Sequence, residues 1–140
     1  MLAFSQAARD AVLAIGCIES GGGHCVSAKD IAAQTGIAEP DLRRILDDLV
    51  KAGLVVAKGD LGGGYVVAVA ADQMSLGDVV AAVETDDPRR DCHLGLPGPC
   101  EGEPCPTGKF WKQERASIEE RLHLITVKEV SAFVEKSNPP

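Results

Sequence analysis

The cysteines are the residues of this chain that could do the most varied chemistry, as free thiols, in disulfides or as metal ligands. There are five, an odd number, and no export signal precedes them. This combination favours reduced thiols or metal ligands over a disulfide framework. Cys17 and Cys25 lie near the start, whereas Cys92, Cys100 and Cys105 form a C-x7-C-x4-C cluster. From this spacing alone, a zinc site and an iron–sulfur cluster are equally well supported, because thiolates bind both.

The three clustered cysteines lie in a segment that disfavours regular structure. Residues 88–108 contain five of the eight prolines and four glycines. A long irregular segment in a compact protein is usually functional or mobile, and this one can fold three thiolates around one centre. The other two cysteines are expected to be structural, Cys17 as a small core residue of a helix and Cys25 as a loop residue.

Composition and charge narrow the class of protein. No nucleophile stands beside a base at a motif spacing and no phosphate loop is present, so the chain is not expected to be an enzyme. No apolar stretch is long enough for a membrane helix, which predicts a cytoplasmic protein without a membrane partner. The net charge is −7, with 8 basic and 13 acidic residues in 71–140. This opposes DNA binding only weakly, because the contacting face alone must be positive.

The first half of the chain shows the pattern of a winged helix-turn-helix, expected over 1–72. Apolar residues recur at helical spacing in 4–18, and a short helix over 28–35 follows Ser27. After the Gly36 turn, Pro40 occupies the first position of a helix that Gly53 closes. The β-branched runs at 54–57 and 65–69 then form a hairpin around a glycine-rich tip. In this motif the second helix of the pair enters the major groove of DNA.

The second half is expected to contain a connecting helix in 73–87, the cysteine loop in 88–108, and two helices in 109–136. The first of these two helices runs to about residue 125 with an apolar stripe, and a capping box at Thr126 opens the second. The stripe is long for so small a domain and suits pairing with the same helix of a second subunit. The fold is therefore mainly α with a small β-hairpin wing, a winged helix-turn-helix plus a long dimerisation helix. The stripe consists of Trp111, Ile118, Leu122 and Ile125.

Over about residues 4–130 the sequence resembles the Rrf-two family of bacterial transcriptional regulators. The order and spacing of the shared motifs make the resemblance specific, and 62–65 (GGGY) is its strongest part. The other matches are 31–32 (IA), 36–37 (GI), 49–55 (LVKAGLV), 75–80 (SLGDVV), the three loop cysteines, Trp111 and 124–127 (LITV).

The resemblance implies an iron–sulfur cluster, either [2Fe–2S] or [4Fe–4S], on Cys92, Cys100 and Cys105. A fourth ligand is harder to assign. The position of a histidine that some members use is Gly108 here, and the position of an acidic residue that others supply from helix one of the partner is Arg9. The remaining candidates for this fourth ligand are Asp10, His93 and Cys17.

The resemblance also indicates where DNA is contacted. Arg43 and Arg44 can supply base or phosphate contacts, and Lys58 can touch the backbone beside the wing. The glycines of the wing let its backbone approach the sugar-phosphate, whereas Glu39 and Asp41 would repel phosphate. The full expected DNA-binding set is Ala38, Glu39, Pro40, Arg43, Arg44, Lys58, Gly62, Gly63, Gly64 and Tyr65.

These features predict a homodimeric regulator of double-stranded DNA that senses iron–sulfur status, nitric oxide or redox state through its cysteine loop. Two alternatives stay open. One is a cluster-free regulator whose cysteines bind zinc or act as a thiol switch. The other is an interaction module whose acidic recognition segment has lost DNA binding.

Overall fold

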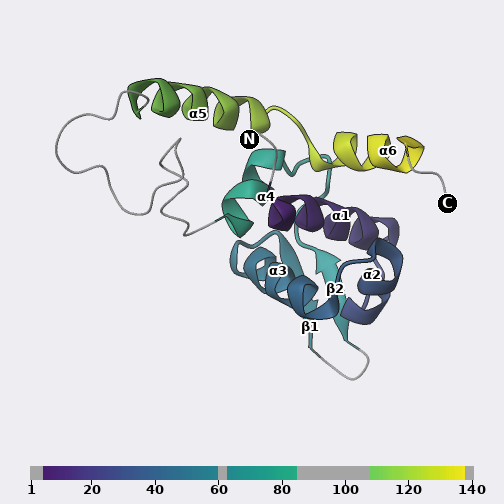
Figure 1. Ribbon diagram of the computed structural model, residues 1–140. Helices are drawn as coiled ribbons and strands as arrows, with labels where there is room; N and C mark the ends of the chain where they lie inside the picture. Colours follow the sequence, from purple (N-terminus) through teal and green to yellow (C-terminus); the bar gives the residue numbers. More distant parts are fainter. Residues whose placement is uncertain (1–4, 60–62, 85–107, 138–140) are drawn as a thin grey trace.

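A computed structural model describes residues 5–59, 63–84 and 108–137 of the chain (Figure 1). It confirms the predicted fold class, since the described residues form helices and one two-stranded antiparallel hairpin. In chain order the elements are α1 (Gln6–Ser20), α2 (Ala28–Thr35), α3 (Glu39–Lys51), β1 (Val55–Lys58), β2 (Gly64–Val67), α4 (Leu76–Val83), α5 (Gly108–Leu122) and α6 (Val127–Ser137). We call α1 to α4 with the hairpin the winged-helix body, and α5 with α6 the carboxyl-terminal arm.

Local capping signals set the helix-turn-helix. Ser27 caps α2, because its hydroxyl accepts a hydrogen bond from the Asp30 amide at 3.1 Å. Gly36 ends α2 in the left-handed conformation with φ 77°, which glycine adopts without steric cost. The next helix starts one residue earlier than expected, so that Pro40 is its second residue and Ala38 its cap.

The hairpin pairs Val55 with Val67 and Lys58 with Gly64. A further bridge joins it to the turn before α2, where Val26 and Tyr65 exchange two backbone hydrogen bonds of 3.0 and 2.8 Å. Gly64 is buried in this contact, and a Cβ at Gly64 would lie 2.6 Å from the Val26 carbonyl oxygen. The close approach of the two backbones therefore explains why a glycine occupies this position.

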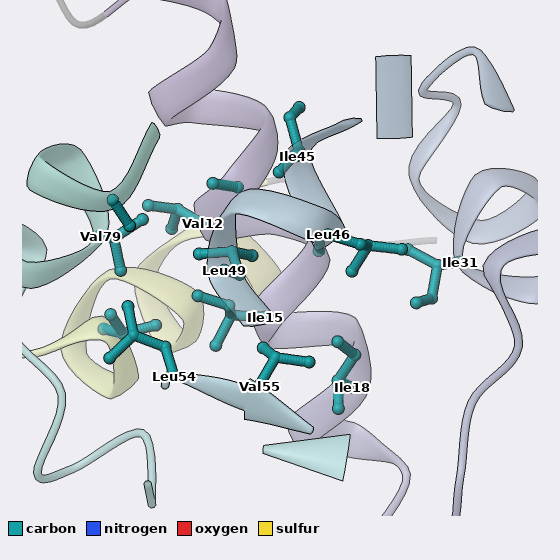
Figure 2. Packing of buried hydrophobic residues seen from close by; sticks show 14 of the residues in the cluster. Val12, Ile15, Ile18, Ile31, Ile45, Leu46, Leu49, Leu54, Val55 and Val79 are labelled. Atoms are coloured by element: carbon teal, nitrogen blue, oxygen red, sulfur yellow. The ribbon is translucent and has the colours of Figure 1, made fainter. Parts of the chain in front are cut away.

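One hydrophobic core holds the body together (Figure 2). Ile15 from α1 and Leu46 and Leu49 from α3 are fully enclosed, and Val79 from α4 joins them. Since buried aliphatic surface is the main stabilising term in folding, this core fixes α3 relative to α1 and the hairpin. The exposed face of α3 is thereby presented on a rigid base.

The arm is joined to the body at the start of α4. Ser75 forms a capping box with Asp78, and the Leu76 amide donates to the Ile125 carbonyl oxygen at 2.8 Å. The expectation that α5 runs to about residue 125 is wrong. The helix ends at Leu122, because Ile125 and Thr126 leave it to bridge to 74–76.

The predicted capping box at Thr126 is confirmed. Its hydroxyl accepts from the Glu129 amide at 3.2 Å, and the Glu129 carboxylate accepts from the Thr126 amide at 2.9 Å. Val127, the first residue of α6, is fully buried against the body. In Figure 1, α6 lies over α1, and α5 lies beyond α4, on the side of the body opposite the hairpin. None of the described helices combines the length and apolarity needed to cross a membrane.

Candidate nucleic-acid interface

Two ion pairs occupy the exposed surface of α3. The Arg43 guanidinium donates to the Glu39 carboxylate at 2.8 Å, and the Arg44 guanidinium donates to the Asp41 carboxylate at 3.0 Å. The opposite face of the helix is buried through Leu42, Ile45, Leu46 and Leu49. The two acidic residues expected to repel phosphate therefore each have an arginine partner within one helical turn.

The two pairs lie on different flanks of α3. The hydrogen bond that Arg43 donates to Glu39 raises the pKa of the guanidinium, and Tyr65 in the wing makes a smaller contribution. Arg44 and Asp41 instead line a surface hollow of about 400 Å³ toward α1 and α4, together with Asp10 and Val83. The sequence showed two adjacent exposed arginines, and the structure separates them into a wing-facing one and one that faces the hollow.

The wing supplies the second part of the expected interface. Lys58 and Gly63 are exposed, Tyr65 is half-buried, and Gly64 is covered by the turn before α2. Gly62 lies outside the described residues. Lys58 borders a second hollow of about 420 Å³ with Glu19, His24 and Cys25. The structure thus brings Lys58 next to the turn between α1 and α2, a neighbour that sequence spacing did not reveal.

The three loop cysteines Cys92, Cys100 and Cys105 lie outside the described residues, as does His93. Within residues 5–59, 63–84 and 108–137, no three histidine, cysteine or acidic side chains are close enough together to hold a metal ion. The part of the chain that the structure describes therefore offers no competing metal site.

Two of the candidate fourth ligands lie in the described part. Burial raises the pKa of the Cys17 thiol, with a smaller contribution from Asp30, and Cys17 donates to the Gln34 side chain at 3.3 Å. A raised pKa opposes the thiolate form that binds metals. Asp10 is buried (6% exposed), with its carboxylate 3.7 Å from the Arg9 side chain, which is itself exposed. The raised pKa of Cys17 and the burial of Asp10 therefore disfavour both groups as metal ligands.

The arm carries the expected dimer stripe. Ile118 and Leu122 are half-buried in α5, Ile125 lies beyond the helix end, and only the backbone of Trp111 is described. Two apolar side chains that the sequence reading missed are far more exposed, Leu124 at 78% and Phe133 at 68%. The sequence offered one signal, the rarity of phenylalanine, since Phe133 is one of only three in the chain, but its exposure follows from how α6 lies on the body.

Comparison with known proteins gives concordant matches. Residues 4–132 match the Rrf2 family, described as "Iron-dependent Transcriptional regulator". The HTH-type transcriptional regulator IscR of Erwinia tasmaniensis is 33% identical over 105 residues, which are 75% of this chain and 63% of that protein. IscR of Aliivibrio salmonicida is 31% identical over 105 residues, 75% of this chain and 62% of that protein. The chain thus spans about three fifths of the length of these relatives.

Solved structures agree with the sequence matches. T. potens IscR superposes with a TM-score of 0.70 at 27% identity, covering 99% of this chain and 93% of the other. CymR, the global cysteine regulator of B. subtilis, superposes with a TM-score of 0.70 at 23% identity, covering 95% and 98%, and supports the fold. The family match over nearly the whole chain and the shared winged helix lead to one conclusion: the chain belongs to the Rrf2 family of transcriptional regulators.

Proposed function

We propose that this protein is a cytoplasmic homodimer that binds double-stranded DNA through α3 and the wing of each subunit. One observation carries the proposal. The exposed face of α3 stands on a rigid core beside the hairpin, in a chain that matches a family of transcriptional regulators over residues 4–132. In winged helices, α3 is the element that enters the major groove, while phosphate contacts beside it fix the register.

The apolar surface of the arm supports the dimer. Leu124 and Phe133 stand in solvent in a single chain, and Ile125 is 38% exposed. Large apolar side chains left exposed are typical of interaction surfaces, and the most exposed ones in the described part of this chain lie in the arm. A second copy that covers the arm with its own arm buries the same residues on both sides, as a two-fold interface requires.

The proposed sensor is an iron–sulfur cluster held by Cys92, Cys100 and Cys105. Three thiolates are the appropriate donor set, and the description of the family as iron-dependent favours iron over zinc. The remaining described candidates are weak ligands, since Cys17 favours its protonated form and Asp10 is buried. When bound, the cluster supplies a centre that is lost or altered by iron limitation, oxidants or nitric oxide.

The described residues offer a route from the sensor to the DNA-binding face. The segment that carries the cysteines joins α4 to α5, and α5 contacts α4 next to the Leu76–Ile125 hydrogen bond. A shift of α5 would therefore displace the start of α4 first. Because Val79 of α4 packs in the core with α3, the displacement would reach α3 through this core. A cluster regulates only if it binds one dimer geometry better than another.

Anaerobic purification tests the sensor. We expect a coloured protein with iron and acid-labile sulfide, both lost in the C92S/C100S/C105S variant. Cys25→Ser is the matched control, because Cys25 is exposed and lies outside the loop, and it should keep the colour. A colourless protein that contains zinc, or no metal at all, would overturn the cluster and leave the zinc or thiol-switch alternatives.

A further inference from the structure

We propose that Glu39 and Arg43 act as one unit that reads a C·G base pair in each half of the operator. This inference rests on the proposed DNA binding and adds the base that the protein selects. It assigns a positive role to Glu39, whose charge alone would argue against DNA contact.

The geometry of the pair is the first argument. Glu39 and Arg43 are four residues apart at the amino-terminal end of α3 and are linked at 2.8 Å. Their side chains are 45% and 60% exposed, so neither is committed to the core. The amino-terminal residues of a recognition helix are those that contact base edges. The pair therefore stands at the correct end of the helix and is accessible.

The flank that carries the pair is the second argument. Arg44 and Asp41 border the hollow toward α1 and α4, whereas Glu39 and Arg43 do not line it. Tyr65 of β2 also contributes to the raised pKa of Arg43, so we place the Glu39–Arg43 pair on the flank of α3 toward the wing. Since α3 and the wing must touch one duplex together, this flank is turned toward DNA. The Asp41–Arg44 pair is on the other flank and borders the hollow with Asp10, which provides an internal comparison within the same helix.

Complementarity to the base edge is the third argument. In the major groove a C·G pair presents the cytosine N4 amino donor next to the guanine O6 and N7 acceptors. Arginine binds O6 and N7 with two hydrogen bonds, and a glutamate beside it accepts from N4. In an A·T pair the adenine amino donor separates the two acceptors, so the arginine loses its two-pronged contact. The neighbouring carboxylate and guanidinium thus match C·G better than A·T.

The ion pair also removes the electrostatic objection to Glu39. Its charge is balanced by Arg43, so the unit is neutral when it approaches the phosphates. The arginine also keeps the carboxylate beside it, so that both groups can approach one base pair together. A lone glutamate at this position would have neither advantage.

Selection of bound duplexes from a random pool tests the inference, with the full-length protein in both its anaerobically purified and metal-free forms. The wild type should enrich a symmetric site with a fixed C·G pair in each half. Glu39→Gln should shift that position toward adenine, which a glutamine amide binds with two hydrogen bonds, and reduce the preference for C·G by about tenfold. Asp41→Asn, the matched control on the other flank, should return the wild-type site.

The outcomes distinguish failure of base reading by the pair from failure of DNA binding itself. If Glu39→Gln and wild type select the same site with the same preference at every position, the pair does not read a base and the inference is wrong. If the wild type enriches no site in either form, the proposed DNA binding itself fails. Thermal melting serves as the folding control, since both side chains are exposed and their surface pair contributes little to stability. A melting temperature far below wild type in Glu39→Gln would show that the pair stabilises the fold, and it would also overturn the inference.

Discussion

The winged-helix body and the carboxyl-terminal arm differ in how far their apolar side chains are buried. In the body, Ile15, Leu42 and Leu46 are fully enclosed by the same chain. In the arm, Leu124 is 78% and Phe133 68% exposed, while Val127 is the one fully buried side chain among those that the structure describes there. The body therefore completes its packing within one chain, whereas the arm leaves large apolar side chains in solvent, as the proposed dimer requires. The comparison teaches that dense packing supports the face proposed to read DNA, and that incomplete packing lies where we propose the second copy binds.

The largest expected effect tests the body. Leu46→Ala removes a side chain that is fully buried between α3 and the core, so the free energy of unfolding should fall by about 2–5 kcal/mol in urea denaturation. Leu124→Ala in the arm should change it by less than about 0.5 kcal/mol when the single chain is measured at high dilution. Equal losses in the two variants would contradict the comparison.

The junction of the two regions should respond next most strongly. A Cβ at Gly77 would lie 2.5 Å from the His123 ring, which packs on α4 at the end of α5. Gly77→Ala should therefore lower the free energy of unfolding by about 1–2 kcal/mol through overpacking.

The double variant of that junction sharpens the prediction. With His123→Ala already present, adding Gly77→Ala should raise the free energy of unfolding by up to about 1 kcal/mol, because alanine is the better helix former. A change of the same sign in both backgrounds would show that the His123 ring does not limit how α5 sits on α4.

The capping box that begins α4 should show a smaller effect. The Ser75 hydroxyl accepts from the Asp78 amide at 3.0 Å and lies 3.1 Å from His123 Nδ1. Ser75→Ala should cost about 1 kcal/mol of unfolding free energy and speed hydrogen exchange of the Asp78 amide. Ser20→Ala, at the exposed carboxyl end of α1, is the control and should leave both quantities nearly unchanged.

The smallest effect on folding, with a clear effect on assembly, is expected in the arm. Phe133→Ser should change the unfolding free energy of the single chain by less than about 0.5 kcal/mol. Dimer dissociation, followed by sedimentation equilibrium, should become at least about tenfold easier if the ring is buried against a partner. Val56→Ser, an exposed apolar change in the hairpin, should not affect dissociation. Unaltered dissociation in Phe133→Ser would remove this residue from the interface.

Local signals made much of the fold predictable. Helix α2 occupies 28–35 as expected, because Ser27 and Gly36 act within one turn of its ends. The end of α5 was not predictable in this way, since Ile125 leaves the helix to bond with Leu76, a partner distant in sequence. Tertiary contacts override local pattern at such points.

The candidate site shows the same division. The sequence predicted only that Glu39 repels phosphate and that Arg43 contacts DNA, whereas the structure joins the two at the i,i+4 spacing of a helical ion pair. The placement of Arg43 toward the wing and Arg44 toward the hollow depends on how α3 packs, and spacing does not encode it. The exposure of Phe133 likewise becomes known only once the position of α6 on the body is known.

The central claim is that two bodies, joined by their arms, read two half-sites of one duplex. Native mass spectrometry of the full-length protein on its selected operator tests it directly. The account predicts two chains per duplex, and it predicts loss of that complex when five base pairs are inserted between the half-sites, since this places them about half a helical turn apart in phase. One chain per duplex, or a two-chain complex that tolerates the insertion, would contradict it.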